Sequence, residues 1–410
     1  MPVHPPASAM TAGTIVLLLS LLLGLQPITT DLYLPALPAL TSSFGAPMAQ
    51  AQLTLTALLL AFGVSQLVWG PLSDRFGRKP ILLTGLGAYV LAGVGSTLAP
   101  SMMALIVWRA VQGAAMGAAV MCARAIVRDL YAPTQGARVM SKALSGLGVI
   151  ALLSAPLGGL LTEVFNWRAA MLVLALFGAL CLGLIASRFE ETLQQQNPKA
   201  MQITTLLATW KLILRHPTFL AFSALSAASY GGLFTFLATS SFVFMNVLGL
   251  SKTGYGALMA LNSLVYVAGT FLCRHWLPRF GVRRAVKWAG MLSLAGGTLM
   301  AVPSLMGVQN IWAILPAQLL FMMGHGVHQP CGQSGAVGPF PQAAGAASAM
   351  NGFLMMLVAF AMGSWLGTHM DGSVKPLTLG VWFWTAWIAL SAWTLVQKYG
   401  EPTLCRNQTA

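Results

Sequence analysis

The stretch Gly70-Pro71-Leu72-Ser73-Asp74-Arg75-Phe76-Gly77-Arg78-Lys79-Pro80 joins two long apolar segments of the chain. Its central part, Arg75-Phe76-Gly77-Arg78-Lys79, has a counterpart 204 residues later, Arg279-Phe280-Gly281-Val282-Arg283. Each copy follows the second long apolar segment of its half of the chain. An Arg-Phe-Gly triplet repeated at matching positions predicts that the chain consists of two related halves.

The composition excludes an ordinary soluble protein. The 410 residues are 57% hydrophobic and only 7% charged, whereas soluble domains carry about 25% charged residues. The formal net charge of +14 does not predict nucleic-acid binding, because the bases are scattered between apolar segments and form no dense patch. The five cysteines lie far apart without the spacing of a zinc or redox site, so we interpret them as packing residues.

Twelve segments have the length and character of a membrane-spanning helix, which needs about 20 mostly apolar residues. They lie near 12–38, 50–72, 79–99, 102–127, 139–161, 168–187, 217–241, 253–275, 284–304, 310–332, 344–368 and 376–397. We therefore expect an all-α membrane protein of two pseudo-symmetric six-helix halves, residues 1–187 and 217–410, around a central cavity. In the central cytoplasmic linker, 188–216, the mixed apolar and basic residues of 201–215 predict an amphipathic helix on the membrane surface.

The positions of the basic residues predict the orientation, because Lys and Arg accumulate in cytoplasmic connections. With the N-terminus inside, only Arg168, Lys252 and Lys375 of the 22 Lys and Arg residues fall on the outer side, and only Arg109 falls within a span. Both termini are therefore expected in the cytoplasm.

The loop at 70–80 resembles motif A of the major facilitator superfamily, G-x-L-a-D-r-x-G-r-k, at nearly every position. The resemblance implies the superfamily's fold and a conformational latch made by Gly70, Asp74, Arg75, Gly77, Arg78 and Lys79 with Asp129. Asp74 can face the positive end of a neighbouring helix, and Arg78 and Lys79 can pair with Asp129. Such contacts would hold the halves together when the cavity faces outward. The alternative is a simple turn that keeps its bases on the cytoplasmic side.

Three further stretches narrow the resemblance. Residues 109–113, Arg-Ala-Val-Gln-Gly, resemble motif B of the fourth helix, and 148–159 resemble motif C of the fifth helix, the signature of drug:proton antiporters. Motif C is carried here by Gly148, Pro156, Gly158 and Gly159, although Ala155 replaces a usual glycine. Residues 30–38, Thr-Asp-Leu-Tyr-Leu-Pro-Ala-Leu-Pro, are similar to the first-helix signature of the Bcr/CflA multidrug-efflux branch.

Asp31 is the only acidic residue expected within a span, and Arg109 is the only base. A charge at that depth costs at least ~2.5–3.5 kcal/mol on insertion scales, so it usually has a partner and a function. We expect the two side chains to face each other as the proton-coupling pair. Burial favours the neutral carboxyl and a nearby guanidinium favours the carboxylate, so their competition would let Asp31 exchange protons. The alternative is a static salt bridge between two helices.

The superfamily's fold implies a cavity lined by the first, fourth, seventh and tenth helices of the chain, with their neighbours beside them. The candidate substrate contacts are Tyr33, Gln112, Met116, Tyr230, Phe234, Asn262, Tyr266, His325, Gln329 and Asn351. Aromatic and Met side chains suit a promiscuous binder, although ordinary packing is an equal alternative for each residue. His325 and His328 do not complete a metal site, so no metal is expected.

Together these features predict a proton-coupled secondary transporter that exports drugs or small amphipathic compounds across the bacterial inner membrane by alternating access. The branch resemblance implies substrates such as bicyclomycin, chloramphenicol-type drugs and sulfonamides. The alternatives are a metabolite exporter, for example of an amino acid or cysteine-related compound, and a proton-coupled uptake symporter. We expect no enzyme activity, no cofactor besides the proton gradient, no nucleic-acid partner and a monomer in contact with membrane lipid; the absence of G-x-x-x-x-G-K-[ST] argues against ATP.

Overall fold

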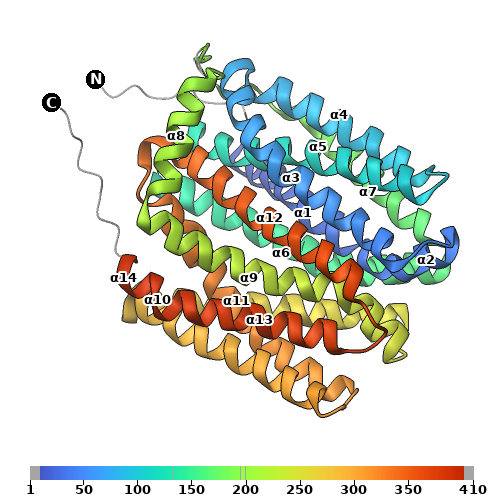
Figure 1. Ribbon diagram of the computed structural model, residues 1–410. Coiled ribbons are helices and arrows are strands. Elements are labelled where there is room, and N and C mark those ends of the chain that lie inside the picture. Colours follow the sequence, from blue (N-terminus) through green and yellow to red (C-terminus); the bar gives the residue numbers. More distant parts are fainter. Residues whose placement is uncertain (1–9, 132, 194, 199, 401–410) are drawn as a thin grey trace.

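The computed structural model describes residues 10–131, 133–193, 195–198 and 200–400, and helices make up nearly all of this part of the chain (Figure 1). The first seven α-helices are α1 (Ala12–Asp31), α2 (Leu37–Phe44), α3 (Met48–Phe76), α4 (Arg78–Thr97), α5 (Met102–Leu130), α6 (Pro133–Val164) and α7 (Trp167–Arg188). The others are α8 (Ile203–Arg215), α9 (Pro217–Ser241), α10 (Lys252–Leu305), α11 (Ile311–Val337), α12 (Ala344–His369), α13 (Lys375–Trp393) and α14 (Leu395–Tyr399). Three shorter helices are the 3-10 helices η1 (Leu34–Ala36) and η3 (Pro341–Ala343) and the π-helix η2 (Phe242–Val247).

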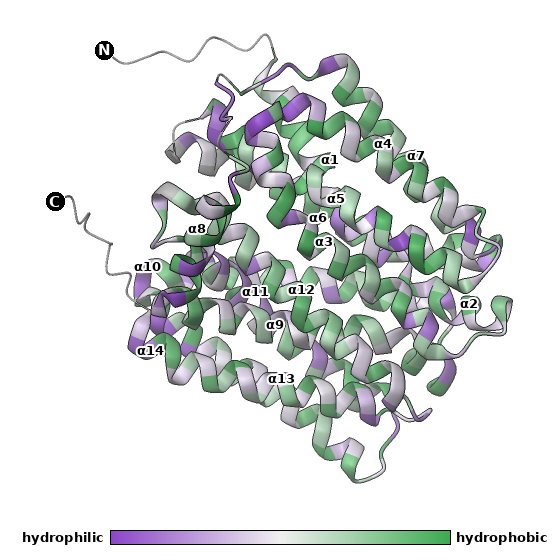
Figure 2. Cartoon of the chain, turned by 45° about the horizontal axis from the view of Figure 1, so that its top comes forward, coloured by the Kyte–Doolittle hydropathy of each residue, from purple (hydrophilic) through white to green (hydrophobic). Residues whose placement is uncertain are grey.

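Eleven helical segments in the described part of the chain are long and apolar enough to cross a membrane. One of them, α10, contains a non-helical residue, Gly281, and consists of two helices joined by a kink. The twelve predicted spans are therefore confirmed. Figure 2 shows apolar residues along the lengths of the helices and hydrophilic residues mainly towards the two ends of the bundle.

The first predicted span, 12–38, is not one continuous helix. Helix α1 ends at Asp31, and the chain then passes through η1 into α2. Pro35 and Pro38 begin the two later pieces, and a proline has no backbone N–H to donate to the preceding turn. The sequence that resembles a branch signature thus breaks the helix next to the acidic residue.

The repeated triplet occupies equivalent places in the fold. Gly77 lies between α3 and α4 with φ 100° and ψ 162°, and Gly281 divides α10 with φ 72° and ψ 171°. Positive φ values of this kind favour glycine, which has no Cβ to clash with the backbone. The junction of α3 and α4, the kink of α10 and the helix α8 lie at the end of the bundle near the two described chain ends, which we call the terminal face (Figure 1); the other end is the opposite face.

Helices α3 and α12 pack together, and so do α6 and α10. These two seams join the N-terminal helices to the C-terminal helices. Small residues let the backbones approach: a Cβ on Gly256 of α10 would lie 2.8 Å from Cα of Pro156 in α6. Close helix packing through small residues is the usual device inside a membrane, where lipid supplies no hydrophobic force between helices.

The linker between α7 and α9 contains α8, as the pattern of 201–215 predicted. Four of its large apolar side chains are exposed, Ile203, Leu207, Leu212 and Leu214. Its position on the membrane surface and the division of the chain into halves at 187 and 217 remain predictions, although α7 ends at Arg188 and α9 begins at Pro217.

Candidate functional site

Asp31 is the last residue of α1 and is half-buried. Its carboxylate accepts a hydrogen bond of 2.8 Å from the Thr30 hydroxyl. The tyrosines Tyr230 of α9 and Tyr255 of α10 lie within electrostatic reach of this carboxylate. Asp31 therefore belongs to the N-terminal helices but borders side chains of the C-terminal helices.

Arg109 of α5 is completely buried, and its contacts lie within the N-terminal helices. It donates to the Thr29 carbonyl at 2.9 Å and to the Gln112 side-chain oxygen at 2.7 Å. Its guanidinium carbon also lies 4.5 Å from the ring centre of Tyr33, a cation–π distance. No ion pair joins Arg109 to Asp31 in the described residues; the expected direct pairing is wrong for this structure.

The end of α1 explains why Arg109 turns to the backbone. The last four carbonyls of a helix have no partner within the helix, and Thr29 supplies one of these. A cation near these carbonyls is also favoured by the helix dipole. Arg109 thus caps the broken end of α1 at a carbonyl two residues before the acid that it was expected to neutralise.

Two tyrosines complete the surroundings of this helix end. The Tyr33 hydroxyl lies 2.5 Å from the Thr54 hydroxyl of α3, and the Tyr89 hydroxyl of α4 lies 2.6 Å from the Thr29 hydroxyl. Both tyrosines are fully buried. Tyr33 and Gln112, predicted as substrate contacts, are therefore partners of Arg109 in this structure, and no sequence motif indicated Tyr89.

The predicted contacts in the C-terminal helices form two polar groups. In the first, the Ser226 hydroxyl of α9 donates to Asn351 of α12 at 3.0 Å, and the Gln329 amide of α11 donates to the Ser226 carbonyl at 3.1 Å. In the second, His325 Nδ1 lies 2.8 Å from the Ser229 hydroxyl, and its ring centre lies 5.4 Å from that of Tyr266.

The remaining candidates are buried but belong to neither group. Tyr230 of α9 lies close to the side chain of Gln26 of α1, across the two sets of helices. Met116 and Phe234 are fully buried, and the side-chain oxygen of Asn262 has no hydrogen-bond partner in the structure. The side-chain nitrogen of Gln112 is also without a partner among the described residues. An unpaired buried amide group is costly, so Asn262 and Gln112 both have capacity left for a ligand.

The described residues contain no group of three or more His, Cys, Asp and Glu side chains arranged to hold a metal ion. His328 is completely buried on α11, close to the backbone of Val286 in the second part of α10.

The loop at 70–80 forms an ion-pair network at the terminal face. Arg78 is 1% exposed, and it donates to Asp129 at 2.8 Å and to both Asp74 and Ser73 at 2.7 Å. Arg128 reaches Asp74 at 3.5 Å. The predicted Arg78–Asp129 pair is thus confirmed, and all these ionic partners come from the N-terminal helices.

The other predicted members of this network differ in their contacts. The Lys79 side chain makes no ion pair in the described part of the chain, so its expected pairing with Asp129 is wrong. Arg75 lies at the surface over the Phe76 ring. A Cβ on Gly70 would meet only the end of Met121, at 3.6 Å, so Gly70 makes no exceptionally close helix contact.

Glu191 in the linker is a structural partner of the loop that the sequence did not indicate. Its two oxygens each accept a backbone N–H at 2.9 Å, from Arg78 and from Lys79. These are the first two residues of α4, whose N–H groups have no partner within the helix. Glu191 therefore caps α4 from 112 residues or more away, a contact that no local pattern predicts.

Contacts between the two sets of helices exist at both faces. Near the terminal face, Arg124 of α5 donates to the Ser348 hydroxyl of α12 at 2.8 Å. At the opposite face, the Glu163 carboxylate of α6 accepts from the Thr253 backbone N–H at 3.1 Å and from its hydroxyl.

The glycines of α6 differ in their surroundings. A Cβ on Gly158 would lie 2.0 Å from the Leu32 carbonyl oxygen, and one on Gly159 would lie 2.6 Å from the Lys252 carbonyl oxygen. Gly158 thus presses against the backbone just after Asp31, and Gly159 and Pro156 pack on α10. A Cβ on Gly148 would meet nothing within 4 Å, so no close contact requires a glycine there.

Several known proteins are similar in sequence to this chain. The chain is 31% identical to multidrug resistance protein D of Escherichia coli, over 95% of this chain and 98% of that protein. It is 29% identical to a chloramphenicol resistance protein of Pseudomonas aeruginosa, over 82% and 79% of the two chains. A bicyclomycin resistance protein homolog of Haemophilus influenzae is 26% identical over 88% and 91%.

Solved structures show the same fold. The xylose transporter XylE from E. coli, in a partially occluded inward-open conformation, matches 97% of this chain and 99% of its own with a TM-score of 0.74 and 15% identity. The family model described as Major Facilitator Superfamily matches residues 19–364. A multi-pass helical fold, the loop at 70–80 and these matches agree: the chain belongs to the major facilitator superfamily.

Proposed function

We propose that this protein exports drugs or small amphipathic compounds across the bacterial inner membrane in exchange for protons, with both termini and the terminal face in the cytoplasm. The observation that carries the proposal is the placement of Asp31. It is a half-buried carboxylate without an ionic partner in the described residues, at the break of a transmembrane helix and beside the C-terminal helices. Acids at such depth in a membrane protein typically serve proton or substrate transfer.

The surroundings support competition between proton and substrate at this carboxylate. Tyr230 and Tyr255 approach it from the C-terminal helices, so a compound bound between the two sets of helices would meet it. The buried residues nearby are mainly aromatic or apolar, with a few polar groups, which is the composition of small-molecule sites. The names of the relatives, which refer to multidrug, bicyclomycin and chloramphenicol resistance, support drugs as the substrate class.

Contacts between the helix sets at both faces support alternating access. Opening towards the terminal face requires the loss of the Arg124–Ser348 hydrogen bond, and opening towards the opposite face requires the loss of the Glu163–Thr253 contact. Each contact is small, so either can break while packing along the seams is kept. A ligand then shifts the equilibrium by its difference in affinity for the two states.

Reconstituted protein tests the role of Asp31. In proteoliposomes with a pH gradient, wild type should move chloramphenicol or bicyclomycin against the direction of proton flow. Asp31→Asn, which keeps the size of the side chain, should insert normally but lose transport driven by the gradient. Asp371→Asn is the matched control, because Asp371 lies in an exposed loop at the opposite face.

The result separates the candidate functions. Unchanged gradient-driven transport by Asp31→Asn would show that Asp31 does not couple protons. Movement of the compound in the same direction as protons would identify a symporter. An efflux-deficient bacterium that expresses the gene should become less susceptible to the same drugs, and an unchanged susceptibility across a drug panel would favour a metabolite as substrate.

A further inference from the structure

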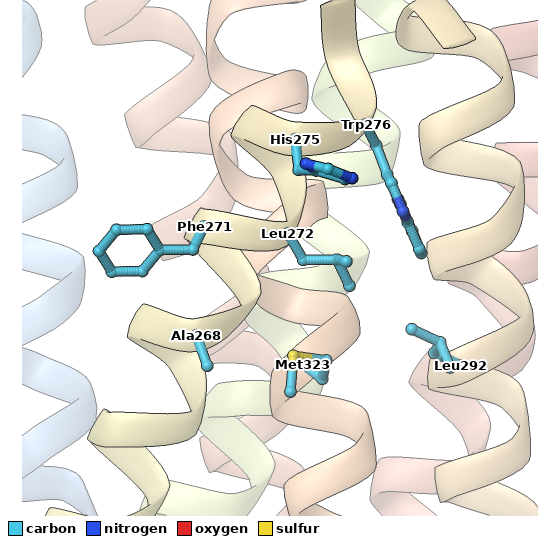
Figure 3. Close-up of a pocket in the computed structure, with 7 residues that line it drawn as sticks. All are labelled: Ala268, Phe271, Leu272, His275, Trp276, Leu292 and Met323. Carbon is cyan, nitrogen blue, oxygen red and sulfur yellow. The ribbon is translucent and has the colours of Figure 1, made fainter. Parts of the chain in front are cut away.

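A groove of about 720 Å³ opens on the outside of the C-terminal helices (Figure 3). Leu272 and Trp276 of the first part of α10 line it, together with Leu292 of the second part and Met323 of α11. One titratable side chain, His275, lies in its lining near the terminal face. The volume of the groove falls within the range of small-molecule sites, and in a membrane protein its apolar walls suit a hydrocarbon chain.

Two arginines extend the walls of this groove towards the terminal face. Arg279 follows His275 by four residues on one wall, and Arg284 precedes Leu292 by eight residues on the other. Residues four apart lie on the same side of a helix, and each residue rises by about 1.5 Å. The Cα atoms of the two arginines therefore lie roughly 6 Å and 12 Å beyond His275 and Leu292, and both side chains are exposed.

An aromatic cluster marks the level at which the groove meets these bases. The Trp288 ring centre lies 5.5 Å from that of Trp276 and 4.6 Å from that of Phe280. Arg274 lies over the Phe271 ring at 4.2 Å. Tryptophan and arginine side chains of this kind concentrate at the boundary between the hydrocarbon core and the lipid headgroups.

No acid of the described residues forms an ion pair with Arg279 or Arg284. Between Glu191 and Asp371 the sequence contains no Asp or Glu. The first copy of the repeat differs, since Arg78 is held between Asp74 and Asp129. In the second copy, Pro278 occupies the position of Asp74.

From this juxtaposition we propose that the groove is a binding site for one anionic phospholipid, with an acyl chain along Leu272, Leu292 and Met323 and the phosphate between Arg279 and Arg284. The lipid phosphate supplies the negative charge that the protein supplies itself in the first copy. Basic pockets between transmembrane helices are suited to such headgroups. A zwitterionic lipid such as phosphatidylcholine would fill the groove and offer the same phosphate, but the cationic group of its headgroup offsets that charge beside the two guanidinium groups, so an anionic lipid should bind more tightly.

Native mass spectrometry of the full-length protein in a neutral detergent tests the site. The probes are phosphatidylglycerol and phosphatidylcholine with identical acyl chains, and wild type should retain phosphatidylglycerol preferentially. Each of Arg279→Gln and Arg284→Gln should weaken its binding about fivefold, the change that corresponds to ~1 kcal/mol for one basic residue near the membrane surface. The double variant should lose the preference for phosphatidylglycerol.

Three controls locate the site and identify its ligand. Lys375→Gln removes one exposed charge at the opposite face and should leave the preference unchanged. Ala268→Trp, at an exposed position in the groove, should reduce retention of both lipids. Thermal unfolding of the arginine variants at the wild-type temperature would show that these variants remain folded. Glycerol 3-phosphate, which has no acyl chain, should not bind.

The proposal is overturned if wild type retains both lipids equally, or if the double variant keeps its preference. Loss of the preference in Lys375→Gln would contradict the location. Tight binding of glycerol 3-phosphate would identify a site for a soluble phosphate instead. None of these measurements depends on transport or on Asp31, so their outcome is independent of the proposed function.

Discussion

Gly158→Ala tests the contact between α6 and the break in the first membrane span. The new Cβ would lie 2.0 Å from the Leu32 carbonyl oxygen, 2.7 Å from its carbonyl carbon and 3.0 Å from its Cα. A Cβ is hardly ever found within 3.0 Å of a heavy atom, so the two segments must separate by about 1 Å. No side-chain rotation relieves the overlap, because all three atoms belong to the backbone.

The magnitude follows from two opposed effects. Overpacking costs about 1–3 kcal/mol, and a clash with backbone atoms belongs at the upper end of that range. Replacing a helical glycine by alanine gains up to ~1 kcal/mol. We therefore expect Gly158→Ala to lower the free energy of unfolding by about 2 kcal/mol. Because Leu32 follows Asp31, the displacement should also reduce proton-coupled transport.

The same helix supplies a matched control. Gly148→Ala is the identical change in α6, but nothing lies within 4 Å of its new Cβ, so this variant should be slightly more stable than wild type. In thermal unfolding in detergent, the free energies of unfolding of the two variants should differ by about 3 kcal/mol. This difference is the overpacking cost alone, because both variants gain the same helix propensity from alanine. If both variants unfold at the same temperature and transport equally well, the close approach at Gly158 does not exist in the functional protein.

Three further substitutions test contacts of the latch and of the helix end. Arg78→Lys keeps the charge but loses the planar guanidinium that reaches two carboxylates. Thermal unfolding should show a free energy of unfolding lower by about 1.5–3 kcal/mol. An unchanged unfolding midpoint would mean that the network adds no stability. Glu191→Ala removes the cap of α4 and should cost about 1 kcal/mol, with Glu191→Gln closer to wild type in the same measurement because an amide oxygen still accepts one N–H. Arg109→Gln should destabilise the protein. Adding Asp31→Asn should not restore the lost stability, because Arg109 and Asp31 form no ion pair. Recovery of stability in the double variant would show that the two side chains do form a pair.

The sequence was sufficient for the helices because span length and apolar character are local properties. The predicted 217–241 agrees with α9 (Pro217–Ser241), and 168–187 agrees within a residue with α7 (Trp167–Arg188). The predicted 50–72 is shorter than α3 (Met48–Phe76). Hydropathy ends a segment where polar residues begin, yet Ser73 and Asp74 remain helical because their side chains bond to Arg78.

The site was predicted less completely because its contacts join distant parts of the chain. Matched depth along two helices placed Asp31 near Arg109 but did not determine which way either side chain turns. The carbonyls at the end of α1 determine the direction of the Arg109 side chain. Pro35 and Pro38 were the signal in the sequence that the helix ends there. Nothing local could have indicated Glu191, whose partners lie on another helix and in another part of the sequence.

The absence of an Asp31–Arg109 ion pair strengthens the role proposed for the acid. A carboxylate locked to a buried guanidinium gains little from a proton or a cationic substrate, because its charge is already compensated. Here Arg109 is held by the Thr29 carbonyl, Gln112 and the ring of Tyr33, so its charge stabilises the helix end whatever the state of the acid. Asp31 remains half-buried with only a hydroxyl donor. We infer that the base keeps the break of α1 in place, while the acid is left free to exchange its proton for a substrate.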